Sequence, residues 1–218
     1  MYLTQFEINA ARRGARALLS SPQRMHAAVL SSFTAAEREP TPGGRILWRV
    51  DQRGNQTLLY LASPHRPDLT NLAEQAGWPT KQTWRIGDYA RLLDQLTTDD
   101  QWAFRLTANP VRNGRKTENS ARTQRLGHVT AAQQQTWLLD RTGKHGFTVN
   151  TGDHKEPDLI VRDRHIHNFS RAGRTVTLAT ATFEGRLTVT DPDALRAALT
   201  RGIGPAKGYG CGLLTLAR

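Results

Sequence analysis

Short runs of alternating apolar and polar side chains occur along the whole chain, and each run predicts a β-strand. Between the first two runs, every fourth position from Met25 to Phe33 is apolar, as in the buried stripe of a helix. Ser20 or Ser21 can cap this helix, and Pro22 suits its first turn. The first half of the chain thus predicts a strand at 2–9, a helix beginning near Pro22, and strands at 46–50 and 57–61 joined as a hairpin with Gly54-Asn55 in the turn. A helix at 87–96 and a strand at 102–108 follow.

The order of these elements, β-α-β-β-α-β, is that of a ferredoxin-like domain, and the second half repeats it. Thr130 and Gln133 form a capping box at the start of a helix, and a change of apolar phase within 174–189 predicts a bulge. The second half predicts strands at 126–129, 146–150, 158–169, 174–189 and 212–217, with helices from Thr130 and over 192–199. The predicted fold is α+β, with two tandem ferredoxin-like (RRM-like) βαββαβ domains.

A polar and basic segment separates the two halves. Residues 112–125 contain five basic side chains, Arg115 and Lys116 among them, and almost no apolar one. This composition is typical of a linker or loop at a domain boundary. We therefore expect an N-terminal domain at 1–111, a linker at 112–125 and a C-terminal domain at 126–218.

The charge of the chain predicts a polyanionic partner. Thirty Lys and Arg residues against nineteen Asp and Glu give a net charge of +11 and a pI near 10.8. Such a surplus favours nucleic acid, although basic surface can also serve solubility. No run approaches the roughly 18–20 apolar residues that cross a bilayer, and the N-terminal residues lack a signal peptide's apolar block. With a single cysteine, the chain cannot form an intrachain disulfide, so we expect a cytoplasmic protein.

His26 is the first residue with candidate chemistry. It lies within the apolar stripe of the first predicted helix, so it is either a packed core histidine or a group that emerges into a cleft. It is also within two turns of the helix start, where the helix dipole attracts phosphate. A neutral histidine near its working pH suits proton transfer.

Five glycines lie within residues 202–212, around Lys207. The spacing does not fit a P-loop or a Rossmann fingerprint, because the fifth position after Gly202 is Lys207 instead of glycine. The segment, called here the glycine loop, is either a helix-to-strand turn or a loop whose N–H groups and lysine hold a phosphate backbone.

A third candidate is the segment 162–174, predicted to be a β-ribbon rich in cationic and aromatic side chains. Arginines can follow an RNA groove while a histidine or phenylalanine stacks on a base. A solvated hairpin is the alternative, and a metal site is conceivable because Asp163, His165 and His167 alternate on one strand face. The residues expected to bind RNA here are Arg162, Arg164, His165, His167, Phe169, Arg171 and Arg174.

The sequence contains no Ser-His-Asp elbow, HExxH helix or paired metal-binding carboxylates. If the protein cuts nucleic acid, we therefore expect it to do so without a metal ion or any other cofactor. RNA permits this, because its 2′-OH can attack the adjacent phosphate and expel the 5′-oxygen. That reaction needs a base or acid, nearby cations and in-line geometry.

In combination, these segments resemble the CasE family of Cascade-type CRISPR RNA-processing endoribonucleases, subtype I-E. The resemblance runs in order over nearly the whole chain, and the glycine loop is its most specific part. The segments that carry it are MYLTQFEINA, SPQRMH around His26, FRLTANPVR, FEGRLTVTDP and GIGPAKGYGCGLL.

This resemblance implies two ferredoxin-like domains and metal-independent cleavage at the 3′ base of the CRISPR repeat stem-loop. It implies attack by the 2′-OH, a 2′,3′-cyclic phosphate or 3′-phosphate end, and a product that stays bound in the surveillance complex. It places the catalytic residue at His26, the groove-binding hairpin at 162–174 and the glycine-rich loop at 202–212. Further residues expected to contact RNA are Gly204, Lys207, Gly208, Arg115 and Lys116.

The chain departs from the family pattern at one position. Gln23 stands three residues before His26, where familiar members have tyrosine, and glutamine can orient a phosphate or a 2′-OH but cannot transfer a proton. Gln23 is therefore a supporting candidate, together with Arg24 and Lys207 for charge stabilisation.

Two other functions stay open from sequence. One is a CRISPR repeat RNA-binding module that does not cleave, which Gln23 favours; the other is a basic scaffold or DNA-binding protein in which His26 is part of the core. The expected partners are the repeat stem-loop or mature crRNA and other Cascade subunits, with no membrane. Alone, the protein is expected to be monomeric.

Overall fold

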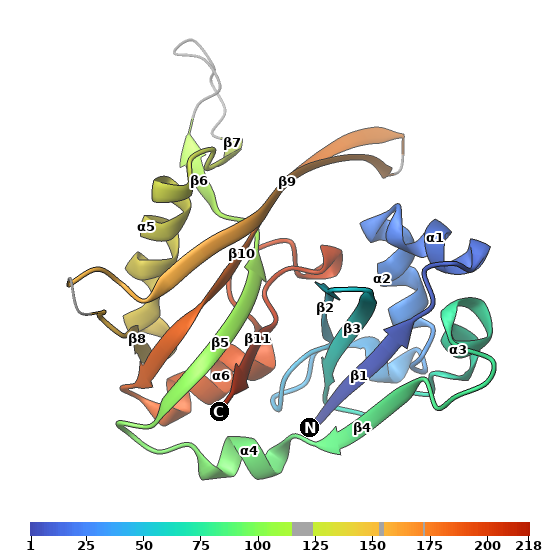
Figure 1. Cartoon of the computed structure of the whole chain (residues 1–218), viewed down its shortest axis with the longest axis horizontal. Helices are drawn as coiled ribbons and strands as arrows, with labels where there is room; N and C mark the ends of the chain where they lie inside the picture. The colour runs from blue at the N-terminus through green and yellow to red at the C-terminus, as the bar shows by residue number, and fades with distance from the viewer. Residues whose placement is uncertain (115–123, 153–154, 172) are drawn as a thin grey trace. The chain divides into compact units, whose positions relative to one another are not determined.

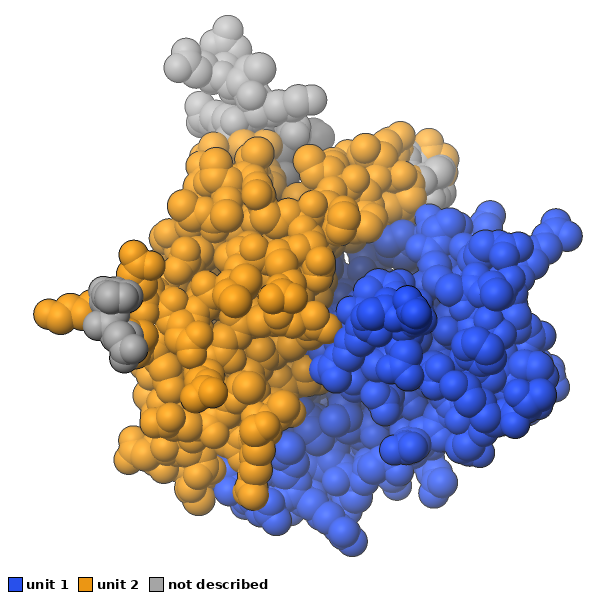
Figure 2. All heavy atoms as spheres, in the orientation of Figure 1, with its two compact units in different colours: residues 1–96, 196–213 blue, residues 97–195, 214–218 orange. Residues whose placement is uncertain are grey.

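A computed structural model of the chain describes residues 1–114, 124–152, 155–171 and 173–218 (Figure 1). Its contacts form two compact units, coloured separately in Figure 2. Unit 1 comprises residues 1–96 and 196–213, and unit 2 comprises residues 97–195 and 214–218. These bounds differ from the domain boundaries expected at 111 and 126 in two ways. Residues 97–111 group with the C-terminal half, and residues 196–213, which contain the glycine loop, group with the N-terminal residues.

Unit 1 contains one antiparallel sheet, and its strands and helices follow one another in the ferredoxin-like order. The strand order is β2-β3-β1-β4, which is the order that a βαββαβ chain produces when both crossovers are helical. Its elements are β1 (Tyr2–Ile8), α1 (Arg13–Leu19), α2 (Pro22–Leu30), β2 (Leu47–Arg53), β3 (Gln56–Ser63), α3 (Thr70–Ala76), β4 (Trp84–Asp88) and α4 (Ala90–Gln95), with 3₁₀ turns at Ala36–Arg38 and Lys207–Tyr209.

The start of α2 confirms the sequence prediction. Ser21 is extended, its side chain accepts a hydrogen bond from the Arg24 backbone N–H, and Pro22 is the first helical residue. Met25 and Val29, on the predicted stripe, are fully buried in the core against β1, β2 and β3. Because these two side chains point into the core, they fix the rotation of α2 about its axis and so the direction in which its other side chains point.

The predicted hairpin at Gly54-Asn55 is confirmed, since β2 and β3 pair on either side of it and Gly54 has a φ of 55°. The helix predicted at 87–96 is wrong at its start. Residues 84–88 form β4, which pairs with β1, and α4 begins only at Ala90. Pairing with β1 thus overrides the local helical pattern, and the preceding crossover helix is α3, which the sequence analysis did not predict.

Unit 2 repeats the same sheet order with β5 as its first strand. The order is β11-β5-β10-β8, and β9 also pairs with β10. The strand predicted at 102–108 therefore exists, but assigning it to the first sheet was wrong. Its elements are β5 (Gln101–Ala108), β6 (Val111–Gly114), β7 (Gln124–Gly127), α5 (Ala131–Thr142), a 3₁₀ turn (Gly143–His145), β8 (Phe147–Val149), β9 (Leu159–Arg171), β10 (Arg174–Val189) and β11 (Leu214–Ala217).

The helix α6 (Pro192–Arg201) begins in unit 2 and ends in unit 1. The capping box of α5 is present as predicted, with Thr130 and Gln133 bonded to each other's backbone. The strand predicted at 126–129 corresponds to β7, which, among the strands that the structure describes, pairs with β6 in a separate two-stranded sheet. The rest of the predicted linker, residues 115–123, lies outside the described residues.

The ribbon formed by β9 and β10 extends beyond the rest of its sheet. β10 pairs with β5 only over Ala181–Thr188, while its pairing with β9 continues to Arg174 (Figure 1). The predicted bulge exists, but the extra residue is in β9: His165 faces Thr180 and Arg162 faces Thr182. The distal part of the ribbon is therefore not paired with β5.

Among the helices of the described residues, none is long and apolar enough to span a membrane.

Candidate functional site

His26 lies on α2 beside the buried stripe and is itself half-buried. Because Met25 and Val29 are buried in the core, the backbone of α2 at His26 is anchored against the hydrophobic core of unit 1. The His26 side chain is therefore neither fully buried in the core nor fully exposed on the surface of the helix.

The imidazole of His26 stacks on the indole of Trp48, a residue of β2. Their ring centroids are 6.5 Å apart with an interplanar angle of 22°, and the Trp48 Nε1–H donates a hydrogen bond of 3.3 Å to His26 Nδ1. Trp48 itself is only 4% exposed. The histidine is thus oriented by a side chain that belongs to the core.

The glycine loop packs directly on this pair of rings. A methyl group added at Gly208 would lie 3.2 Å from His26 Nε2, and one added at Gly210 would lie 2.7 Å from the Trp48 ring. Gly210 also has a φ of 79°, which favours glycine. Gly210 is therefore required for the close approach to Trp48, and Gly208 leaves room for the loop to lie directly against His26.

The side chain of Lys207 packs against other residues of the same glycine loop. Its side chain passes Gly202 and Gly212, where added methyl groups would lie 3.0 Å and 3.3 Å from it, and its Nζ donates to the Gly204 carbonyl at 2.5 Å. Burial, followed by the charge of Arg45, lowers the pKa of Lys207. A half-buried lysine beside a second cation favours an anion, because an anion would offset both the desolvation and the repulsion.

Arg45 is the second cation and precedes β2 in sequence. Its Nε is buried and, within the part of the chain that the structure describes, has no hydrogen-bond partner. A buried guanidinium N–H without an acceptor is costly, so an added phosphate oxygen is a suitable partner. Lys207 and Arg45 together form the cationic part of the site in unit 1.

The other two supporting candidates are on the first turn of α2. Gln23 is half-buried and, three residues before His26, lies on the same face of the helix. Arg24 is exposed and two residues away, so it lies on a different face. The geometry therefore keeps Gln23 beside the histidine and gives no direct support to Arg24.

In unit 2, the bulge in β9 rearranges the faces of the predicted RNA-binding ribbon. Asp163 has a φ of 47° and, with Arg164, stands opposite a single residue of β10. As a result, Arg162 shares a face with His165 and His167, whereas simple alternation would put it on the opposite face. Asp163 leaves that alternation, so its predicted grouping with the two histidines was wrong.

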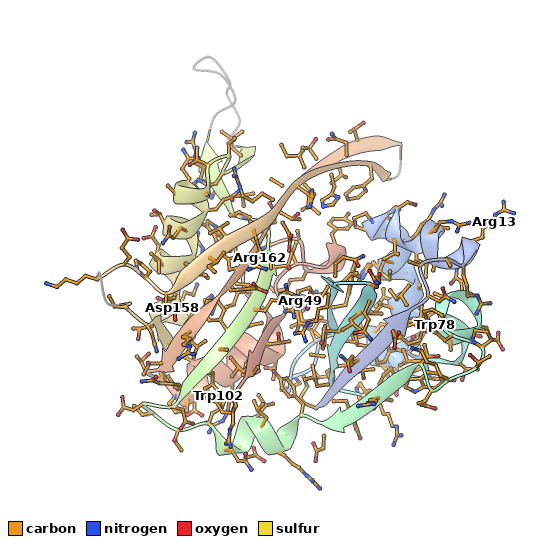
Figure 3. All side chains as sticks on the ribbon, in the orientation of Figure 1. Arg13, Arg49, Trp78, Trp102, Asp158 and Arg162 are labelled. Carbon is orange, nitrogen blue, oxygen red and sulfur yellow. The ribbon has the colours of Figure 1, made fainter. Side chains whose placement is uncertain are left out.

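Arg164 is turned away from this face. Its Nε donates to the Gln134 side chain of α5 at 3.0 Å, and its Nη2 donates to the Val129 carbonyl. Arg162, labelled in Figure 3, pairs instead with Glu184 at 3.0 Å and has a side chain 48% exposed. Of the two arginines, Arg162 is therefore the one on the face of the two histidines, and Arg164 joins the ribbon to α5.

His165 and His167 lie side by side on the ribbon, with ring centroids 5.9 Å apart. His167 Nε2 is 3.3 Å from the Thr180 hydroxyl, and burial, with a smaller effect of His165, lowers the pKa of His167. His165 is exposed, and Phe169, further along the same face, is half-buried. This face combines a cation with planar rings, as an RNA-binding surface requires.

Some predicted residues have no description at the level of side chains. Arg115 and Lys116 lie outside the described residues. Arg171 and Arg174 pair through their backbones at the ribbon's end, and their side chains also lie outside. Across residues 1–114, 124–152, 155–171 and 173–218, no group of three or more His, Cys, Asp or Glu side chains could hold a metal ion.

The sequence analysis missed Trp48 and Arg45. Trp48 was counted only as an apolar position of a strand, and Arg45 stands in no motif. Both contact the site through the fold of unit 1 around β2, and the sequence pattern contains no signal for that.

The whole chain matches a protein-family model described as "CRISPR associated protein", over residues 1–218. The CRISPR-associated endoribonuclease Cse3 of Thermus thermophilus is 29% identical over 231 residues, which cover 100% of both chains. The Cascade subunit CasE of Escherichia coli is 32% identical over 120 residues, covering 52% of this chain and 56% of that protein.

Solved structures agree with this match. A structure of CRISPR endoribonuclease Cse3 bound to a 19-nt RNA superposes with a TM-score of 0.82 at 28% identity and covers 100% of both chains. A structure of Thermus thermophilus Cse3 bound to an RNA representing a pre-cleavage complex gives a TM-score of 0.80 at 29% identity, covering 100% of this chain and 98% of that one.

Proposed function

Because this chain belongs to the CRISPR-associated protein family, whose model it matches over residues 1–218, we propose that it is an endoribonuclease that processes CRISPR precursor RNA. It cleaves at the 3′ base of the repeat stem-loop without a metal ion and keeps the mature crRNA bound. The observation that carries this proposal is the placement of His26 against Gly208 of the glycine loop. The similarity to an endoribonuclease over the full length of the chain supports a role for this histidine in RNA cleavage.

The proposed reaction is an internal transfer within the RNA. The 2′-oxygen attacks the adjacent phosphorus, the P–O5′ bond breaks, the 2′-OH loses its proton and the 5′-oxygen gains one. The product end is a 2′,3′-cyclic phosphate. His26 is the catalytic residue, and Lys207 and Arg45 stabilise the negative charge that develops on the phosphate oxygens.

The RNA stem is proposed to bind the ribbon of β9 and β10 through Arg162, His165, His167 and Phe169. The side chains of this face come from unit 2, and their cation and rings suit a phosphate backbone and exposed bases. As CasE is named a Cascade subunit, the crRNA-bound protein is proposed to assemble with other Cascade subunits.

The experiment that tests this function is a cleavage assay on a repeat hairpin from the host, carried out in EDTA. A second RNA carries one 2′-deoxy substitution at the nucleotide before the cut. We expect the all-ribose RNA to be cut and the deoxy RNA to be bound but intact, because only the 2′-OH can act as nucleophile. Gel analysis of the ends should show a 2′,3′-cyclic phosphate or its 3′-phosphate hydrolysis product.

A second function is favoured by Gln23, which stands where the resembled family has a tyrosine. The protein would then bind the repeat without cutting it. If both RNAs are bound with equal affinity and neither is cut, this binding module replaces the nuclease. Cleavage of the deoxy RNA, or a requirement for Mg²⁺, would contradict the proposed mechanism.

Gly208→Ala is expected to slow cleavage by about tenfold or more, while the affinity for the hairpin stays within about twofold. The added methyl lies 3.2 Å from His26 Nε2, so it displaces the ring or covers its outer nitrogen. Gly208 has no positive φ, so alanine fits the backbone. Single-turnover rates and filter binding measure the two quantities.

The matched control is Gly87→Ala in β4 of the same unit, where the added methyl meets only a carbonyl at 3.8 Å. This variant should cleave at the parent rate. Equal cleavage rates for Gly208→Ala and Gly87→Ala would show that His26 Nε2 does not take part in the reaction.

A further inference from the structure

The hydrogen bond between Trp48 and His26 determines which nitrogen of the imidazole carries a proton. We propose that Trp48 is a positioning residue that holds neutral His26 in the Nε2–H tautomer, so that His26 presents a hydrogen-bond donor to the scissile phosphodiester. The effect of the tautomer on cleavage rests on the proposed function. The tautomer itself is a property of the free protein.

The argument begins from the chemistry of the two groups. An indole Nε1–H can only donate, so the His26 Nδ1 that it contacts at 3.3 Å must be the accepting nitrogen. In a neutral imidazole one nitrogen accepts and the other carries the hydrogen. The proton of neutral His26 is therefore on Nε2, on the side of the ring that faces Gly208.

Trp48 cannot easily rotate away from this role. It is 4% exposed and belongs to the same core cluster as Met25 and Val29 of α2. Its ring is also closed in by the glycine loop, where a methyl on Gly210 would lie 2.7 Å away. The donor is fixed by packing before RNA arrives, which is how preorganised sites hold their hydrogen bonds.

The tautomer determines what His26 offers to the substrate. With the hydrogen on Nε2, the ring donates to an oxygen of the phosphodiester, a nonbridging oxygen or the departing 5′-oxygen, and stabilises its growing negative charge. The opposite tautomer would present a lone pair instead and place two N–H groups against each other at Trp48. The residue that orients the histidine is therefore on β2, and Gln23 on α2 is not needed for this task.

The direct test uses nuclear magnetic resonance on protein labelled with ¹⁵N at histidine, at a pH where the His26 ring is neutral. In the parent protein we expect His26 Nδ1 to show the shift of an unprotonated nitrogen and Nε2 that of a protonated one. In Trp48→Phe, which keeps an aromatic ring but has no N–H, the Nδ1–H tautomer should appear. Assignment comes from comparison with His26→Gln.

The second arm measures single-turnover cleavage of the repeat hairpin. Trp48→Phe is expected to slow cleavage about three- to tenfold, the size of one ordinary hydrogen bond, while the affinity for the hairpin is unchanged. The control is Trp84→Phe in β4 of the same unit. Trp84 stacks on Phe6 with ring centroids 6.4 Å apart and an interplanar angle of 14°. Trp84→Phe therefore makes the same indole-to-phenyl change at a ring that stacks on Phe6 and not on His26.

A slower Trp48→Phe with a changed tautomer, beside an unaffected Trp84→Phe, supports the positioning role. A parent protein with the proton on Nδ1 overturns it, as does a Trp48→Phe variant with the parent's tautomer and rate. The resonance arm needs no RNA. If the parent protein cuts no RNA, the proposed nuclease function fails while the tautomer assignment is still decided.

Discussion

Replacing His26 by alanine is expected to abolish cleavage of the repeat hairpin and to leave its binding intact. A positioned proton donor or acceptor contributes about 10²–10⁴-fold to such reactions, so the single-turnover rate should fall by at least about a hundredfold. A neutral imidazole carries no fixed charge, whereas the proposed RNA affinity comes from the ribbon of β9 and β10 and from the charges of Lys207 and Arg45. Rates from quenched gels and dissociation constants from filter binding separate the two effects.

The control for this variant is His65→Ala, a histidine of the same unit that follows β3 and is remote in sequence from α2. It should cleave at the parent rate. A His26→Ala protein that loses affinity in proportion to rate would show that His26 holds RNA and does not act on the reacting atoms. Circular dichroism of His26→Ala and His26→Gln excludes loss of fold as the cause.

Local signals in the sequence predicted many elements correctly, and each has a physical reason. The cap of α2 at Ser21, the turn at Gly54 and the capping box at Thr130 depend on hydrogen bonds or dihedral angles within a few residues. The resemblance to the CasE family and the predicted fold class are also confirmed, by the family match and by the two sheets.

The errors concern strands whose partners are distant in sequence. Residues 87 and 88 were predicted as the start of a helix, but they belong to β4, which pairs with β1 some eighty residues earlier. β5 satisfies the period of a strand in either sheet, and only its pairing with β10 and β11 decides which. Alternation predicts that a strand exists, but it does not predict its neighbour.

The candidate site was predictable only in part for the same reason. His26, Lys207 and the glycines are visible because their types are unusual in their local context. Trp48 looks like any apolar strand residue, and its donor role depends on the approach of α2 to β2. Likewise, nothing in the sequence distinguishes Arg164, which is bonded to α5, from Arg162, because the bulge in β9 separates them.

Asp51→Asn is expected to destabilise unit 1 by about 3–5 kcal/mol, the usual cost of removing one partner from a buried ion pair. Arg49 and Asp51 lie on β2 with side chains 2% exposed, joined by hydrogen bonds of 2.7 Å and 2.9 Å. The Arg49 guanidinium, labelled in Figure 3, also lies 5.5 Å from the centre of the Tyr60 ring. Without the aspartate, a buried positive charge loses its counterion.

Hydrogen exchange of the β2 and β3 amides measures this loss within unit 1. The control is Asp88→Asn, the same change in an exposed pair with Arg91 at 3.9 Å, which should alter stability by less than about 0.5 kcal/mol. Arg49→Met combined with Asp51→Leu should cost less than the two single changes together, because it leaves no isolated charge. Equal losses for Asp51→Asn and Asp88→Asn would contradict the argument.

The effect should reach the site as well. Arg49 Nη1 donates a 2.9 Å hydrogen bond to the carbonyl of Leu213, the residue that follows the glycine loop. Trp48, its neighbour on β2, packs against Gly210 of the same loop, so one short strand holds the loop at two points. Asp51→Asn should therefore slow cleavage at temperatures where unit 1 is still folded, whereas Asp88→Asn should not. A destabilised variant with the parent's rate at low temperature would show that the ion pair supports the fold without positioning the loop.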